Sequence, residues 1–139
     1  MKYLLDTNVI SEWTKPRPDV SVVRWLDGVK EDDLFLSVVT IGELWHGIER
    51  LPQSKRRAAL AQWVEQDLSA RFEGRLLGID ERIARTWGVL LAASQQRERA
   101  MHAVDALLAA TAEAYSLTLV TRNTKDFVAS GIRVMNPFG

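Results

Sequence analysis

Short apolar runs alternate with longer helical patterns through the whole of this sequence. Runs at residues 2–5, 34–39, 75–79 and 116–121 have the length and apolar content of buried strands, and residues 131–135 form a weaker fifth run. The segments between them repeat apolar side chains at the spacing of an amphipathic helix. This alternation predicts an α/β fold, with a mostly parallel sheet and helices on both faces.

Several of the helical segments begin with a typical capping residue. Asp19 and Asp80 each precede a helical pattern and are expected to be its N-cap. Another helix is expected to begin with Thr40 as N-cap and Glu43 three residues later, which is the spacing of a capping box. The helix after it should run from residue 54 to about residue 72. Because a short loop joins these two helices, they should pack antiparallel.

Length and composition limit the possible functions. With 139 residues the chain can bury one core, so we expect a single domain over residues 1–139. Lys+Arg and Asp+Glu both number 18, so a nucleic-acid partner would have to be held by local cations. The sequence has no cysteine, which excludes disulfides and thiolate metal sites. It has no membrane-length apolar run or signal-peptide core, so we expect a cytoplasmic protein with no membrane partner.

Four acidic side chains lie at similar places relative to the predicted strands. Asp6 follows the first strand, Glu43 the second and Asp126 the fourth, while Asp105 lies at the start of the helix before the fourth strand. Because the carboxyl ends of parallel strands share one edge of a sheet, these carboxylates should meet there. Their mutual repulsion would be relieved by a hard divalent cation, Mg²⁺ or Mn²⁺.

Three of these acids also have a purely structural interpretation. Asp6 could cap a helix that begins at Thr7, and Glu43 could complete the capping box described above. Asp105 would stabilise the dipole of its own helix from the first turn. The two interpretations are compatible, since a capping carboxylate keeps a second oxygen for other partners.

Few other chemical groups stand out. His46 and His102 do not form a zinc-type pair and are interpreted as ordinary surface or partly buried residues. The sequence contains neither a phosphate loop ending in Gly-Lys-Ser/Thr nor a Gly-x-Ser-x-Gly elbow. Asn8, two residues after Asp6, excludes the paired aspartates of a haloacid-dehalogenase-type phosphatase.

Four short motifs, taken together and in this order, resemble those of PIN-domain proteins. They are LDTNVIS at residues 5–11, TIGEL at 40–44, DALLAATA at 105–112 and VTRN at 120–123. More closely, the chain resembles VapC-type toxins of type II toxin–antitoxin systems, including the FitB-like branch. The resemblance extends from the first residue to the Asn-Pro-Phe ending.

The resemblance implies a PIN fold with strand order 3-2-1-4-5. It implies a toxin that is an Mg²⁺-dependent endoribonuclease, with Mn²⁺ as a possible substitute, and that hydrolyses phosphodiester bonds in RNA. It also implies a homodimer and a small VapB- or FitA-like antitoxin that blocks the site. Two other functions stay open: a non-catalytic module that binds RNA or a partner protein, and a nuclease directed at DNA.

By motif match, Asp6, Glu43 and Asp105 take the places of the three core acids, with the metal mainly on Asp6 and Asp105. Some relatives place an aspartate directly after the Thr-Arg pair, where this chain has the neutral Asn123. Asp126, three positions later, is expected to be the fourth catalytic acid, although it could instead cap a turn. Four polar side chains are expected to support the metal ligands or the phosphate: Thr7, Asn8, Thr121 and Asn123.

Two further sets of residues are candidates for binding partners. Arg122, Lys125 and the basic run at residues 55–57 are the local cations expected to attract RNA, although such a run is commonly a solvated helix face. Trp45 and Trp63 lie on the two antiparallel helices next to Glu43. They are candidates either for contact with the antitoxin or for core packing.

Overall fold

A computed structural model describes residues 1–97 and 100–139 of the chain. Its centre is a five-stranded sheet in the order β3-β2-β1-β4-β5, and every pair of neighbouring strands is parallel. The strands are β1 (Tyr3–Leu5), β2 (Leu34–Ser37), β3 (Leu76–Leu77), β4 (Thr118–Val120) and β5 (Val134–Met135). The α/β class and the strand order implied by the resemblance are therefore confirmed.

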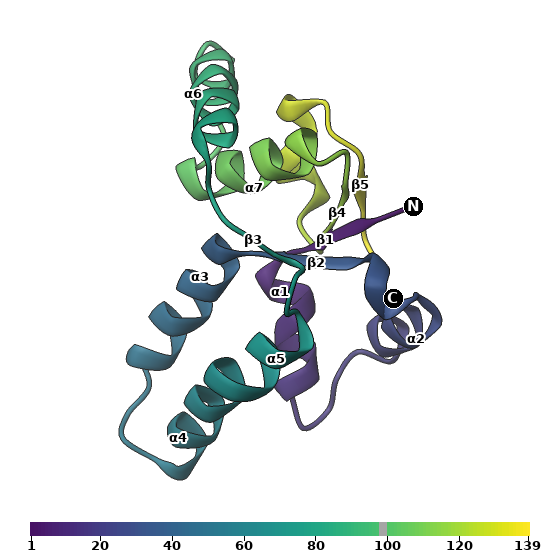
Figure 1. Ribbon diagram of the computed structural model, residues 1–139, viewed down its shortest axis with the longest axis vertical. Helices are drawn as coiled ribbons and strands as arrows, with labels where there is room; N and C mark the ends of the chain where they lie inside the picture. The colour runs from purple at the N-terminus through teal and green to yellow at the C-terminus, as the bar shows by residue number, and fades with distance from the viewer. Residues whose placement is uncertain (98–99) are drawn as a thin grey trace.

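Helices cover both faces of this sheet (Figure 1). Helices α6 and α7 lie on one side, and the helices from α1 to α5 lie on the other. The α-helices are α1 (Thr7–Ile10), α2 (Val20–Gly28), α3 (Val38–Glu49), α4 (Lys55–Gln62), α5 (Ser69–Arg71), α6 (Glu81–Gln95) and α7 (Ala103–Ala114). The 3-10 helices are η1 (Ser11–Thr14), η2 (Glu31–Asp33) and η4 (Thr124–Ser130), and η3 (Trp63–Leu68) is a π-helix. None of the helices in the described part of the chain combines the length and the apolar character needed to cross a membrane.

The core consists of two apolar clusters, one on each face of the sheet. Leu5 belongs to the cluster under α1 and α2, whereas its neighbour Leu4 belongs to the cluster under α7. Successive side chains of a strand point to opposite faces, so a sheet covered on both sides needs continuous apolar strands. On α7, the fully buried Ala106, Ala109 and Ala112 recur every three residues and let the helix lie close to the sheet.

Two of the three predicted N-caps are confirmed and the third is wrong. Asp19 accepts the Ser21 backbone N–H at 2.9 Å, and Asp80 accepts that of Ile83 at the same distance. Helix α3, however, begins at Val38 with Ser37 as its N-cap, because the apolar run of the second strand continues into the first helical turn.

This earlier start changes the environment of two predicted capping-box residues. Thr40 is fully buried inside the first turn of α3, and its hydroxyl has no hydrogen-bond partner within the described parts of the chain. Glu43 lies a turn further into α3 than a capping box would place it. Its carboxylate is therefore available for contacts outside its own helix.

The helix predicted from residue 54 to about residue 72 is present, but its middle part is π-helical. Helix α4 passes into the π-helical segment η3 and then into α5. Within the wider turn, the hydroxyl of Ser69 donates to the carbonyl of Val64 at 3.2 Å. Single π-helical turns of this kind are frequent at functional sites. Here the turn begins at Trp63, which lines a surface groove described below.

Candidate active site

Asp6, the first of the predicted acids, both caps a helix and belongs to a polar network. It follows β1 directly, and its Oδ1 accepts the backbone N–H of Thr7 at 2.7 Å, as an N-cap should. Its Oδ2 accepts the hydroxyl of Thr121 at 2.8 Å and is 3.4 Å from the amide nitrogen of Asn8. Asp6 as a whole is only 8% exposed. Capping therefore accounts for one oxygen, and the network around Thr121 orients the other.

Thr121 connects the ends of the two central strands. Its hydroxyl donates to Asp6 and accepts the side-chain amide of Asn8 at 3.2 Å and the backbone N–H of Asn123 at 3.1 Å. The side-chain oxygen Oδ1 of Asn8 in turn accepts the backbone N–H of Arg122 at 3.1 Å. The structure thus brings Asn8 and Thr121 together around Asp6. Asn123 joins this network through its backbone.

Glu43 extends toward the same strand ends from α3. Its Oε1 accepts the hydroxyl of Thr7 at 2.7 Å, across 36 positions of sequence. This contact replaces the capping box expected from the sequence. Because Thr7 donates its backbone N–H to Asp6 and its hydroxyl to Glu43, one residue fixes the positions of two carboxylates.

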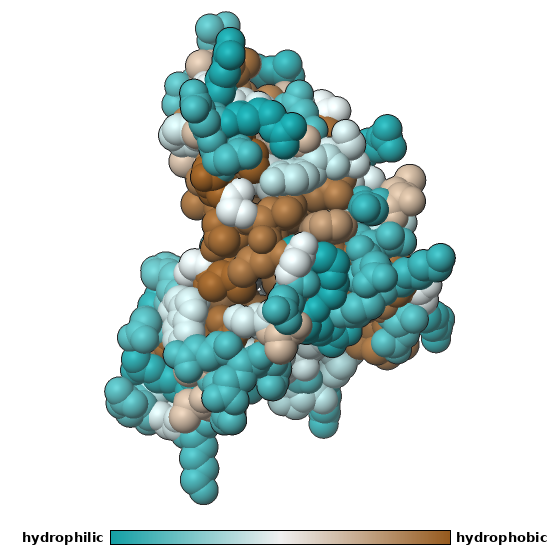
Figure 2. All heavy atoms as spheres, in the orientation of Figure 1, coloured by the Kyte–Doolittle hydropathy of each residue, from teal (hydrophilic) through white to brown (hydrophobic). Residues whose placement is uncertain are grey.

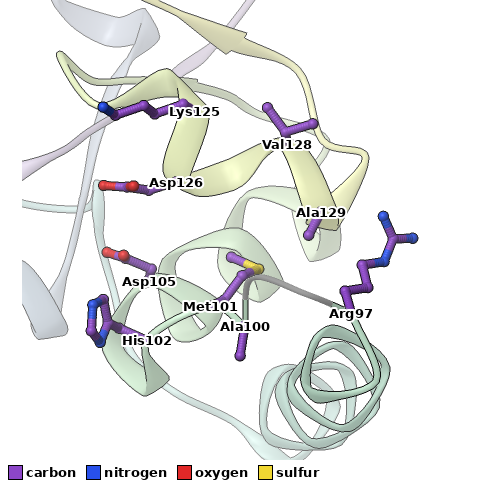
Figure 3. A pocket seen from close by; sticks show the side chains of 9 residues that line it. All are labelled: Arg97, Ala100, Met101, His102, Asp105, Lys125, Asp126, Val128 and Ala129. Carbon is purple, nitrogen blue, oxygen red and sulfur yellow. The ribbon is translucent and has the colours of Figure 1, made fainter.

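Asp105 and Asp126 come from the other side of the sheet, from the first turn of α7 and from η4. Both line a cavity of about 320 Å³. Their carboxylates point the same way and lie next to each other, with Lys125 beyond Asp126 and His102 beyond Asp105 (Figure 3). The order of these four side-chain ends is therefore cation, acid, acid, imidazole.

Electrostatic coupling joins the four acids into one cluster. Burial raises the pKa of Asp105 to about 6, and the negative charges of Asp6, Asp126 and Glu43 add to this increase, while His102 opposes it. Burial is also the main cause that raises the pKa of Asp6 and of Glu43, against the hydrogen bonds they accept. Asp126 raises the pKa of Asp6 further, and Asp6 raises that of Glu43. Carboxylates that oppose one another's ionisation are typical of functional sites.

The donor set of this cluster fits a hard divalent cation held partly through water. All four acids offer oxygen ligands, and a positive ion would offset the repulsion that raises their pKa values. Within residues 1–97 and 100–139, no three acidic or histidine side chains are grouped closely enough to enclose an ion. Mg²⁺ is usually bound through one or two carboxylates together with several waters, and such a binding mode needs no group of three.

Two of the cations predicted to attract RNA are held by other side chains. The guanidinium of Arg122 stacks on the ring of Phe138 at 3.9 Å from its centre. Arg57 forms an ion pair with Glu49 at 2.7 Å and so helps to join α3 to α4. Both contacts stabilise the fold. Arg122 is nevertheless exposed, as are Lys55, Arg56 and Lys125, whereas Arg57 is half-buried.

A second hollow, which we call the α3–α4 groove, lies between the α1–η1 segment and the helices α3 and α4. Its volume is about 260 Å³, and Thr7 and Glu43 belong to its lining, so it reaches the acids. Trp63 also lines it, whereas Trp45 is not among the lining residues of the described chain. Most of the remaining wall is apolar, with Leu44, Ile48, Leu51, Leu60 and Val64.

Two residues near the acids are absent from the set predicted from the sequence. His102 and Arg97 both line the cavity of Asp105. His102 is the N-cap residue of α7, yet its side chain makes no capping hydrogen bond. His102 could have been found from the sequence, because it lies at the start of a helix expected to begin at the acidic edge of the sheet. Arg97 follows the end of α6, and no sequence pattern connects it with the acids.

Comparisons with known proteins agree with this geometry. The PIN domain family profile matches residues 3–129. Toxin FitB of Neisseria gonorrhoeae is 38% identical, and the match covers 97% of each chain. VapC ribonuclease Y4jK of Sinorhizobium fredii is 35% identical, over 97% of this chain and 96% of its own.

A solved structure is similar over almost the whole chain as well. The structure of FitAB bound to an IR36 DNA fragment superposes with a TM-score of 0.91 at 36% identity. The superposition covers 99% of this chain and 96% of that one.

Proposed function

The chain belongs to the PIN-domain family, and from this premise we propose that it is the toxin of a toxin–antitoxin pair and an endoribonuclease, built as a single domain over residues 1–139. The names of FitB as a toxin and of Y4jK as a VapC ribonuclease support the two parts of this proposal. One observation carries it: Asp6, Glu43, Asp105 and Asp126 come from four separate segments and are electrostatically coupled.

VapC-type ribonucleases with a PIN domain generally depend on a divalent metal. We propose that the metal here is Mg²⁺, with Mn²⁺ as a substitute, and that Asp6 and Asp105 hold it. Bound there, the ion would supply charge stabilisation at the phosphate and a more acidic water. Asp6 suits this role because Thr7 and Thr121 fix its orientation, and Asp105 because its charge is unfavourable without a cation.

The other residues have roles that follow from their contacts. In this proposal Glu43, which accepts the hydroxyl of Thr7, orients the water that attacks phosphorus. Thr121 and Asn8 keep Asp6 in position through their hydrogen bonds. Asp126 is the fourth acid in this proposal, since it lines the same cavity as Asp105 and contributes to its raised pKa.

The test of this function uses the purified full chain without its antitoxin. Single-stranded RNA should be cut in Mg²⁺, and EDTA should abolish the cutting. Sequencing the new RNA ends would identify the bonds that are hydrolysed. Cutting of single-stranded DNA in place of RNA would favour the DNA-directed alternative, and binding of RNA without cutting would favour the non-catalytic one.

The roles of Asp126 and Asn123 can be separated by exchanging their charges. Asp126→Asn should weaken Mg²⁺ binding and reduce the cleavage rate about tenfold or more, because it removes a charge beside Asp105. Asn123→Asp should change either quantity little, because Asn123 joins the site through its backbone N–H. Metal titrations of RNA cleavage measure both. If Asn123→Asp bound the metal more tightly, and Asp126→Asn had unchanged metal binding and cleavage rate, position 123 would be the fourth acid site.

We propose that the antitoxin partner occupies the α3–α4 groove. FitAcB and VapBC are similar in fold, and a VapBC structure is described as a member of a family of toxin–antitoxin systems. The groove here is mostly apolar, with Glu43, Lys15 and Arg56 also in its lining. An amphipathic segment can place its apolar face in such a groove. A basic side chain at its end would then pair with Glu43 and block the site.

Trp63→Ala should weaken antitoxin binding by at least about tenfold, since an aromatic residue in a groove is a typical anchor. Trp45→Ala is the matched control, because Trp45 is half-buried on the neighbouring helix but outside the groove lining. Calorimetric titration with the antitoxin measures both affinities. A lower melting temperature of Trp63→Ala with unchanged affinity would instead assign Trp63 to the core cluster that it contacts.

A homodimer is the expected assembly, and one apolar surface is suited to form it. Hydrophobic side chains gather over the middle of the molecule, around β3 and the beginnings of α3 and α7 (Figure 2). Leu76, Ile79, Val38 and Val104 are between 38% and 40% exposed. Light scattering of the purified chain measures the mass, and a monomer at micromolar concentration would contradict this assignment.

A further inference from the structure

The cavity beside Asp105 and Asp126 extends beyond the two acids to apolar and basic side chains. The end of α6, the start of α7 and η4 enclose it, and its volume is about 320 Å³. Met101, which is 8% exposed, and Ala129 provide an apolar wall, and Val128 on its edge is 72% exposed. The proposed function uses only the two carboxylates of this cavity. Its apolar wall and its cations have no role in the metal site.

The cavity is lined by basic side chains as well as by its two acids. Among the described residues that line it, Arg97 and Lys125 are basic and Asp105 and Asp126 are acidic. Lys125 lies next to Asp126, whereas Arg97 lies across the cavity from both acids (Figure 3). An RNA phosphate is repelled by the carboxylates and attracted by these cations. One phosphate of the RNA would lie at the acids, where the bond is cut. The neighbouring phosphate of the chain would therefore lie at the cationic edge of the cavity.

Single-stranded RNA suits a cavity of this composition. Its unstacked bases can enter pockets, and its backbone is bound by cations along the edge. We propose that this cavity is the subsite for the nucleotide adjacent to the bond that is cut, with the base against Met101 and Ala129 and the phosphate on Arg97. The inference rests on the proposed ribonuclease function and adds to it a place where base identity is read.

Binding is measured in the Asp6→Asn background, so that RNA stays intact. Arg97→Ala should weaken binding of a fluorescent single-stranded RNA about tenfold, and should reduce the steepness of its salt dependence by about 0.7. Arg85→Ala is the matched control, since Arg85 is an exposed arginine of α6 outside the cavity lining. It should change neither quantity.

A second variant tests the apolar wall. Ala129→Phe should fill the cavity and weaken RNA binding, whereas Ala92→Phe, at an exposed position of α6, should have no effect. In the chain with Asp6 intact, RNA ends should show a base preference at one position beside the cut. Ala129→Phe should abolish that preference at this position and preserve any others.

The outcomes for the subsite and for the ribonuclease function are distinct. If the unchanged chain cuts RNA, but Arg97→Ala binds like Arg85→Ala and Ala129→Phe keeps the same affinity and preference, the subsite is refuted and the function stands. If the unchanged chain does not cut RNA in Mg²⁺ or Mn²⁺, the proposed function fails, and with it the subsite. Should Ala129→Phe not fold, the comparison of Arg97→Ala with Arg85→Ala decides alone.

Discussion

The Asp6→Asn variant is expected to lose RNA cleavage by about a thousandfold or more while it remains folded. Asparagine has nearly the same shape and can still accept the Thr7 N–H, so the cap of α1 is retained. The substitution removes the charge that holds the cation and reduces the stabilisation of the transition state by several kcal/mol. Initial rates of RNA cleavage measure the loss, and thermal melting verifies the fold.

Asp19→Asn is the matched control for the capping role. Asp19 also caps a helix with its carboxylate, in this case α2, but it lies outside the acidic cluster. It should cut RNA at the normal rate. If a well-folded Asp6→Asn protein cut RNA as fast as Asp19→Asn does, Asp6 would be a cap and nothing more, and the proposed metal site would be wrong.

The Asp105→Asn variant is expected to be inactive and yet more stable than the original chain at pH 7.5 without metal. A pKa of about 6 means that the folded chain holds this proton more tightly than the unfolded chain does, where the value is 3.8. The stability that this proton provides is complete below pH 3.8 and is lost as the pH rises through about 6. At pH 7.5 the ionised Asp105 therefore destabilises the fold, and asparagine removes that cost.

Urea unfolding at several pH values measures the effect of Asp105→Asn. The full shift corresponds to about 3 kcal/mol, but the side chain is half-exposed, and solvent screening reduces the expected gain to about 1 kcal/mol. The gain should disappear near pH 4, and Mg²⁺ should stabilise the original chain more than the variant. Glu113→Gln, at an exposed position of the same helix, should show no such dependence. A variant that is less stable than the original chain at pH 7.5 would contradict the electrostatic explanation.

Local patterns predicted the fold well because the strands are short and apolar, and every strand except β5 is followed by a helical segment. The caps at Asp19 and Asp80 are local hydrogen bonds, so neighbouring residues were enough to identify them. The start of α3 was misplaced because Val38 and Val39 suit a strand and a helix equally well, and only the tertiary structure decides between them.

The acidic site was predictable in its members but not in its contacts. Parallel strand ends share an edge, so topology alone brings Asp6 and Glu43 close together. That Thr7 connects them depends on the rotation of α3, which no sequence pattern specifies. The cavity next to Asp105 was not predictable, because Arg97 and Met101 come from a connection between helices that has no periodicity.

The central position of β1 has a consequence for the synthesis of this protein. Strand β1 leaves the ribosome before both of its neighbours in the sheet, β2 on one side and β4 on the other. Thr121, which orients Asp6, therefore emerges more than a hundred positions after it. A nascent or prematurely terminated chain that stops before β4 contains neither Thr121 nor Asp126. The order of translation thus delays assembly of the complete acidic cluster until β4 and η4 have been synthesised, and fragments released before then lack it.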